Sequence, residues 1–328
     1  MFIIRKILAW AAIPIAMAAA FALAAPYGED RYVYHELAGI YEPSAVQQLP
    51  DGRLLVVEDE AAHALSLLSV KPDRTLKTDE EASKTLMQSL NGKLDDLEAL
   101  AMDKEGYIYA ATSYATLKDG RRLPERERLV RFKIRGNRAR DMKDAVNLKA
   151  ALLKAESVQK AIMNKTGQRV DFNRLNIEGM AYDTKQERLL LGLREPLADK
   201  YSIVISINNP KALFEHRAAP VFGEVALLDL AGGGIRSLDY LAASETYLIA
   251  NETDSQKHQK PRARLWLWDG KPQAAARPFE FSGSDEMKNA EAAGAIQISG
   301  QSYLLVMSDV GKAKKKKPSR YVIEDFKP

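Results

Sequence analysis

The sequence predicts an all-β protein, a β-propeller with five blades, from a degenerate repeat that runs along the chain. Five segments share one order of features: an acidic residue, a small residue, an apolar step, a turn, an apolar strand and a polar cluster. The repeats start near residues 42, 98, 178, 235 and 291, and a further strand-like run follows each pair of strands. Short strands in units of about 40–60 residues are typical of propellers, because each small sheet buries its faces against its neighbours in the ring.

Composition supports a folded domain and excludes several kinds of chemistry. Of 328 residues, 46% are hydrophobic and 28% are charged, which excludes a disordered chain. The absence of Cys excludes disulfides, thiolate nucleophiles and Cys-bound metal centres. A net charge of +4 is too small to indicate nucleic acid as a partner.

Residues 1–24 have the layout of a bacterial secretory signal peptide. Arg5 and Lys6 precede an uncharged stretch from 7 to 25, and Ala22-Leu23-Ala24 matches the A-x-A pattern of a cleavage site. We therefore expect residues 25–328 to form one periplasmic or secreted propeller domain. An uncleaved anchor is the alternative, because the uncharged stretch approaches the length of about 20 residues that crosses a bilayer. No later stretch is long and apolar enough, so no membrane span is expected after removal of the leader.

Segments outside the repeats complete the predicted ring. Residues 32–40 alternate and are rich in aromatic side chains, so we expect them to supply a strand that closes the ring against the last blade. Apolar residues at helical spacing over 141–168 predict a helical insertion between the second and third blades. A divergent sixth blade in this region is the alternative. The Lys-rich run at 312–317 is expected to be a solvated hairpin loop or, alternatively, an anion-binding patch.

Three segments resemble a bacterial family catalogued as domain of unknown function 3616: NIEGMAYD at 176–183, LLLGLREPL at 189–197 and GGGIRSLDY at 232–240. The resemblance covers most of the mature chain and implies an exported propeller with no established activity. The Glu-Gly-x-Ala unit is more distantly similar to the esterase-like-activity-of-phytase domain and to the gluconolactonase and regucalcin propellers. Those relatives hold a divalent metal in the central channel through Glu, Asn and Asp. By this resemblance Glu178 is a metal ligand, and Asn251 and Asp309 stand at strand ends where they would complete the set.

Polar residues recur at positions that a propeller brings to one end of its channel. Charged residues stand at the repeat starts, and further polar residues follow the second strand of each blade or lie in the most specific motifs. The candidates at the starts are Glu42, Glu98, Glu178, Arg236 and Glu291; the others are Asp59, Glu60, Ser113, Arg194, Asp239, Asn251, Glu252 and Asp309. Crowded carboxylates repel one another, so either the two arginines neutralise them or a hard cation such as Ca²⁺ binds their oxygens.

Two functions are compatible with this cluster. The first is a hydrolase acting on a small ester, lactone or phosphoester, in which a channel-bound divalent cation polarises the substrate. Glu178 is then a ligand or general base, and Arg194 or Arg236 stabilises developing negative charge. The second is a non-catalytic periplasmic propeller that binds a small molecule or an envelope protein. In that case each polar residue serves a structural contact between blades, and Arg194 forms a buried salt bridge instead of a substrate clamp.

Overall fold

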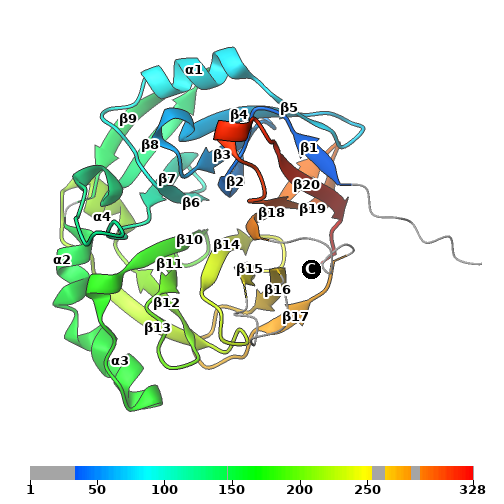
Figure 1. The fold of residues 1–328 in the computed structure, drawn as a ribbon. Coiled ribbons are helices and arrows are strands. Elements are labelled where there is room, and N and C mark those ends of the chain that lie inside the picture. The colour runs from blue at the N-terminus through cyan, green and yellow to red at the C-terminus, as the bar shows by residue number, and fades with distance from the viewer. Residues whose placement is uncertain (1–33, 146, 253–262, 282–288, 328) are drawn as a thin grey trace, which may run out of the picture. The chain divides into compact units, whose positions relative to one another are not determined.

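In the computed structural model, which describes residues 34–145, 147–252, 263–281 and 289–327, the strands form five antiparallel sheets of four strands each (Figure 1). The prediction of a five-bladed propeller is confirmed. Blade 1 contains β2 (Pro43–Gln48), β3 (Leu54–Glu58), β4 (Leu65–Val70) and β5 (Leu76–Thr78). Blade 2 contains β6 (Leu97–Met102), β7 (Tyr107–Thr112), β8 (Leu129–Arg135) and β9 (Arg138–Asp144). Blade 3 contains β10 (Asn176–Asp183), β11 (Arg188–Glu195), β12 (Ser202–Ile207) and β13 (Phe222–Leu228). Blade 4 contains β14 (Ile235–Leu241), β15 (Thr246–Glu252), β16 (Ala263–Trp268) and β17 (Arg277–Phe279). Blade 5 contains β18 (Ala290–Ile298), β19 (Gln301–Ser308), β20 (Ser319–Asp325) and β1 (His35–Leu37).

The five inner strands contact one another in a closed ring (Figure 1). Going round the ring, β2 contacts β6, β6 contacts β10, β10 contacts β14, β14 contacts β18, and β18 contacts β2. The first strand of the chain closes this ring, because β1 pairs antiparallel with β20 and places His35 opposite Tyr321. The Tyr321 hydroxyl then accepts a hydrogen bond of 2.9 Å from the backbone nitrogen of Leu76, in blade 1. The predicted closing strand is therefore confirmed.

The hydrophobic core lies between adjacent blades. Side chains of a strand alternate between its two faces, so each blade buries residues against both of its neighbours. In β3, Leu55 and Val57 pack with Leu97 of blade 2, whereas Leu54 and Val56 pack with residues of blade 5. This arrangement explains why the strands read as continuous apolar runs and why a single blade is not stable by itself.

Two helices form the predicted insertion, α2 (Leu148–Leu153) and α3 (Glu156–Thr166), between β9 and β10. Their residues Leu152 and Ile162 are buried in the core between blades 2 and 3, so the insertion covers that junction and adds no blade. The other helical elements are α1 (Glu80–Gln88), α4 (Pro210–Glu215), η1 (Ala61–His63), η2 (Pro124–Arg126), η3 (Phe172–Arg174) and η4 (Ala313–Lys315).

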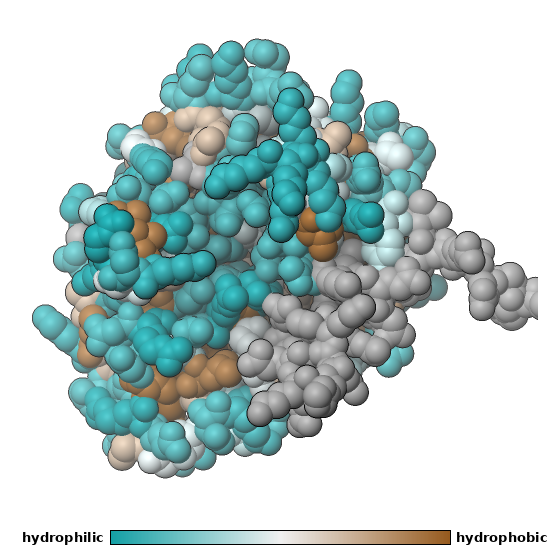
Figure 2. Space-filling view, viewed as in Figure 1, coloured by the Kyte–Doolittle hydropathy of each residue, from teal (hydrophilic) through white to brown (hydrophobic). Residues whose placement is uncertain are grey.

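The Lys-rich run forms the connection between β19 and β20, as predicted for a hairpin loop. Its ends are joined by a backbone hydrogen bond of 2.8 Å from the nitrogen of Lys312 to the oxygen of Lys317. In Figure 1 this connection, with η4, lies in front of blade 1. The surface seen from this side is mostly hydrophilic, and apolar residues gather on it over blade 3 near α3 (Figure 2).

Some outer strands were not predicted, and one predicted segment lies outside the described residues. The outermost strands of blades 1 and 4 were missed because β5 and β17 are largely exposed and have only three residues each. The predicted signal peptide at 1–24 lies outside the described residues. Among the helices of the described residues, none has the length and apolar character that a membrane crossing requires.

Candidate functional site in the central channel

A β-bulge interrupts every inner strand at the same place. In the pairing of each inner strand with the second strand of its blade, the register skips one residue of the inner strand. The skipped residues are Ser44, Glu98, Glu178, Arg236 and Glu291. A bulge leaves one residue unpaired and re-aims its side chain, so five side chains come from equivalent positions around one axis.

Blade 1 departs from the prediction at this position, because Ser44 and not Glu42 occupies the bulge. Glu42 lies two residues earlier, before β2 begins at Pro43. A signal for the correct alignment was present: a small residue follows each bulge, as in Ser44-Ala45 and Glu98-Ala99. The predicted starts at the other four blades coincide with bulge residues.

Ion pairs join three of the bulge residues across blades 3, 4 and 5. Glu178 is 2% exposed; its Oε1 accepts from Nη1 of Arg194 at 2.7 Å and its Oε2 accepts from Nη1 of Arg236 at 3.0 Å. The same guanidinium nitrogen of Arg236 lies 2.7 Å from Oε1 of Glu291. A further bond of 3.0 Å reaches Oε1 of Glu178 from the side-chain nitrogen of Asn176. Glu178 therefore holds two arginines in place, while the Arg194 side chain stays 42% exposed.

Glycines allow blades 3 and 4 to approach closely enough for these contacts. A Cβ on Gly179, the residue after Glu178, would lie 2.7 Å from Cγ2 of Ile235. At Gly234 a Cβ would lie 2.2 Å from the carbonyl oxygen of Arg194. The Gly-rich segment before β14 is thus an entry turn that passes close to the backbone of Arg194.

Glu98 is the bulge carboxyl without an ion-pair partner among the described residues. Burial in the protein and the nearby charge of Glu178 raise its pKa well above the usual range, and a hydrogen bond from Ser44 opposes this only in part. The residue as a whole is half-buried. Burial also raises the pKa of Glu291 to about 8, since Arg236 is shared with Glu178 and cannot fully compensate both carboxylates. The channel thus combines Glu178, whose carboxyl oxygens accept hydrogen bonds from two arginines, with Glu98, a carboxyl group whose pKa is raised well above the usual range.

A second group of acids lies where the strands of blades 1, 2 and 5 meet. Burial raises the pKa of Glu58 to about 7 although its Oε2 accepts hydrogen bonds from the backbone nitrogens of Tyr41 and Glu42. Burial followed by the charge of Glu42 raises the pKa of Asp59 to about 7. Burial and then the charge of Asp309 raise the pKa of Glu42. These acids therefore repel one another as expected, and this repulsion together with burial raises their pKa values.

Asp96 belongs to this acid group and was missed by the sequence analysis. Its backbone nitrogen donates to the backbone oxygen of Asp59 at 2.8 Å, and its side chain accepts a hydrogen bond from the predicted candidate Ser113. Burial raises its pKa, against the effect of Ser113 and of the cation Arg126. It precedes its strand, outside the repeated pattern, so no periodic signal distinguished it. Glu60 contributes to the charge that acts on Asp59 and Glu42.

The remaining candidates make contacts within and between blades. Asn251 is completely buried; its side-chain nitrogen donates to the oxygen of Leu230 at 2.7 Å and its Oδ1 accepts from Nε1 of Trp266 at 2.8 Å. Asp239 accepts from the backbone nitrogen of Ala295 in blade 5 at 3.0 Å, and burial raises its pKa to about 6. Glu252 ends β15, and its side chain lies outside what the structure describes.

The contacts of the residues predicted as metal ligands, Glu178, Asn251 and Asp309, do not fit a metal site. Both carboxylate oxygens of Glu178 are engaged by arginines, and both polar atoms of the Asn251 amide are engaged by protein groups. Within the described ranges, no three His, Asp or Glu side chains are placed to hold a metal ion together. A divalent cation at this site remains a prediction that the arrangement of donors does not support.

Comparisons with known proteins identify the architecture and a family. The family described as "Protein of unknown function (DUF3616)" matches residues 88–325. Among the curated proteins, none matches the chain. A GH32 β-fructofuranosidase of Bombyx mori, in complex with sucrose, is similar in structure with a TM-score of 0.51 and 9% identity, over 90% of this chain and 61% of that one.

Two further solved structures are similar with TM-scores below 0.5. A GH43 β-1,3-galactosidase has a TM-score of 0.49 and 10% identity over 88% of this chain and 94% of that one. The hydrazine synthase of Kuenenia stuttgartiensis has a TM-score of 0.39 and 11% identity over 89% of this chain and 65% of that one. The chain thus spans less than two thirds of the hydrazine synthase and of the fructofuranosidase. At such low identity the likenesses describe the fold and carry no activity.

Proposed function

The chain belongs to the family described as "Protein of unknown function (DUF3616)", a description that carries no activity, and we propose from the channel itself that the protein hydrolyses a small ester-type substrate. The substrate class is a carboxylic ester, lactone or phosphoester with an anionic or strongly polar group. The observation that carries the proposal is the presence of two unlike carboxyl groups at equivalent bulge positions: Glu98, whose pKa burial raises well above the usual range, and Glu178, whose two carboxyl oxygens accept hydrogen bonds from two arginines. A carboxyl group with a strongly raised pKa close to fixed cations is typical of acid–base sites.

Arg194 is suited to bind the anionic group. Its side chain is 42% exposed and, among the residues that the structure describes, pairs with Glu178 through Nη1, so its other guanidinium donors can bind a ligand. Arg236 is 11% exposed and already lies between two carboxylates. Glu178 was predicted as a general base, but with both oxygens engaged it is a positioning residue that fixes the orientation of Arg194.

Glu98 supplies the proton in the proposed step. A water oxygen bonds to the acyl or phosphoryl centre, and the bond from that centre to the leaving oxygen breaks. Glu98 donates its proton to the leaving oxygen, and its carboxylate accepts the proton that the attacking water loses, so the group ends protonated. Arg194 stabilises the negative charge that develops on the substrate. No part of this step passes through a metal.

The experiment is a hydrolysis assay of the purified protein with p-nitrophenyl acetate, p-nitrophenyl phosphate and glucono-δ-lactone. We expect turnover of at least one substrate and a loss of about 10²–10⁴-fold in kcat for Glu98→Gln. Glu187→Gln is the matched control, because Glu187 pairs with Lys104 where both side chains are more than half exposed. Activity should also fall as the pH rises through the raised pKa of Glu98.

Three outcomes would overturn the proposal. Absence of turnover with all three ester types would leave a binding propeller as the better interpretation. Full activity in Glu98→Gln would remove the proton donor. Loss of activity in EDTA with recovery in Ca²⁺ would replace the acid–base step by the metal-dependent one predicted from the sequence.

A further inference from the structure

Positive charge is concentrated in the connection between β19 and β20, whose residues 312–317 we call the lysine loop. Five of these six residues are lysines, and the sixth is Ala313. Without the five lysines the chain has 43 basic residues against 44 acidic ones, so the lysine loop accounts for the whole excess of positive charge. A charge excess that comes from one short segment favours a local contact with an anionic partner.

The ammonium groups of the lysine loop have no counter-charge in direct contact. All five lysines are exposed, and none forms an ion pair or a side-chain hydrogen bond with a residue of the described ranges. Lys312 and Lys314 act electrostatically on Glu42, but that carboxyl group lies beyond the distance of an ion pair. The positive charge of the loop is therefore available to a partner.

Backbone contacts hold the lysines together in spite of their mutual repulsion. The backbone nitrogen of Lys312 donates to the oxygen of Lys317 at 2.8 Å, and the nitrogen of Lys317 donates back at 3.2 Å. Lys316 adopts the left-handed conformation, with a φ of 49°, that closes this short hairpin. At its base, a Cβ on Gly311 would lie 2.1 Å from the carbonyl oxygen of Tyr41. The cluster of charge is thus pre-formed, which lowers the cost of binding.

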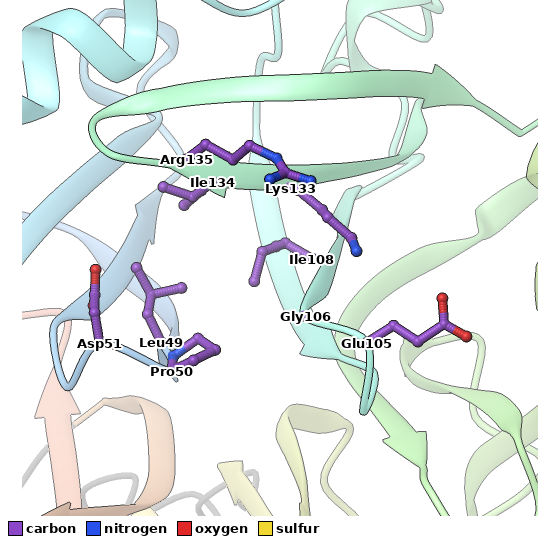
Figure 3. A pocket seen from close by; sticks show the side chains of 9 residues that line it. All are labelled: Leu49, Pro50, Asp51, Glu105, Gly106, Ile108, Lys133, Ile134 and Arg135. Carbon is purple, nitrogen blue, oxygen red and sulfur yellow. The ribbon is translucent and has the colours of Figure 1, made fainter.

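A second group of cations, on the β8–β9 hairpin of blade 2, is arranged differently. Arg135, Arg138 and Arg140 are exposed there, but they are spread along two paired strands, with Arg135 opposite Arg138. Figure 3 shows Lys133 and Arg135 of this hairpin beside a pocket between blades 1 and 2, and the Lys133 ammonium group lies 4.1 Å from the centre of the Tyr107 ring. Because β9 is the outermost strand of its blade, charged side chains on it prevent pairing with another sheet. The hairpin charges thus have a structural explanation that the lysine loop lacks.

We propose that the lysine loop docks the protein on the surface of a bilayer that contains anionic phospholipid. The phosphate groups of such a surface lie in one plane, so a compact exposed loop contacts several of them without a groove or a pocket. Each lysine near an anionic bilayer strengthens binding by about fivefold, so five together favour an anionic over a neutral bilayer by roughly 10³-fold. A nucleic acid is a less suitable partner, because a single loop neutralises few of its phosphates. This inference is independent of the hydrolysis proposed for the channel.

The test is co-sedimentation of the purified protein with vesicles of phosphatidylcholine alone and of phosphatidylcholine mixed with phosphatidylglycerol at about 3:1. We expect binding to the anionic vesicles at an ionic strength of about 0.05 M and loss of most of it at about 0.5 M, where salt screens the charges. The triple change Lys315→Gln, Lys316→Gln and Lys317→Gln should weaken this binding by roughly 100-fold. A second variant, Lys312→Gln with Lys314→Gln, should weaken it by roughly 20-fold.

The matched control removes the same number of exposed charges from the β8–β9 hairpin, by Arg135→Gln, Arg138→Gln and Arg140→Gln together. Binding of this control to the anionic vesicles should stay within about threefold of the parent protein. The apolar stretch at 7–25 is common to all variants, so the differences between them report the loop alone. Thermal unfolding of each variant should match that of the parent, because every replaced side chain is exposed.

The proposal fails if the protein binds neutral vesicles as tightly as anionic ones, or if both lysine-loop variants keep their binding. It also fails if the hairpin control loses as much binding as the triple lysine variant, since the effect would then be the general charge of the protein. Binding of a double-stranded DNA oligonucleotide through the lysine loop, without binding to the anionic vesicles, would assign the loop to a nucleic acid instead.

Discussion

Glu178→Gln is the most informative single change, because it removes one charge from between two arginines and leaves the shape almost unchanged. Removing one partner of a buried ion pair costs about 3–5 kcal/mol. The pair with Arg236 belongs to this class, since the two side chains are 2% and 11% exposed. The pair with Arg194 adds less than about 1 kcal/mol, because that side chain is 42% exposed and solvent screens it.

The expected loss in Glu178→Gln lies at the lower end, near about 3 kcal/mol, since Arg236 keeps Glu291 as a partner at 2.7 Å. For a domain of about 300 residues, with an unfolding entropy of roughly 2.1 cal/mol/K per residue, that loss lowers Tm by roughly 5 °C. Urea unfolding followed by circular dichroism measures the free energy, and Glu187→Gln, at an exposed pair, should change it by less than about 0.5 kcal/mol.

A double-mutant cycle with Arg236→Gln isolates the pair itself. We expect a coupling energy of about 1–3 kcal/mol, since the two groups are in direct contact. The reasoning is refuted if Glu178→Gln costs no more than Glu187→Gln, or if the two single changes in the cycle are additive. Either result would mean that the arginines are not held by this carboxylate.

Two further predictions concern the pH dependence and the close approach of blades 3 and 4. Because Glu58, Asp59 and Glu291 have raised pKa values, of about 7, 7 and 8, the folded protein holds protons that the unfolded chain has already lost. Their stabilising contribution is therefore complete at acid pH and declines from about pH 4.5 to about pH 8, and a free energy of unfolding that rose over this interval would contradict the acid cluster. Gly234→Ala should lower Tm more than Gly120→Ala, because the added Cβ would lie 2.2 Å from the Arg194 carbonyl oxygen, whereas at Gly120 the space is open and only the positive φ of 82° opposes a side chain. Equal losses in thermal unfolding would show that the entry turn tolerates a side chain.

Much of the architecture could be predicted from the sequence, because strands and helices each follow a local pattern of apolar residues. The second and third strands of each blade are apolar on both faces, so they stand out as short runs such as Leu54–Glu58 and Ser202–Ile207. The helices at 148–166 follow a different period from the strands and were recognised as an insertion for that reason. Outer strands such as Arg277–Phe279 are largely exposed and short, so they carry no comparable pattern.

The residues of the candidate site could be predicted from the sequence only in part. Glu98, Glu178, Arg236 and Glu291 were found because they recur at one position of a repeat. The choice of Glu42 over Ser44 was wrong because a bulge is a property of the pairing between two strands, and its one signal in the sequence, the small residue Ala45 after Ser44, was not used to align blade 1.

Residue type and spacing thus determined which side chains belong to the inner strand ends, since a repeated unit places its members equivalently in any closed ring. Only the tertiary structure decided which of those carboxyl groups form ion pairs with the arginines. Arg236 of blade 4 pairs with carboxyl groups from blades 3 and 5, whereas Glu98 of blade 2 has no ion-pair partner among the described residues and its pKa is raised well above the usual range. Such a division depends on distances of a few ångströms between groups far apart in the chain, and these exist only after the blades have closed around one axis.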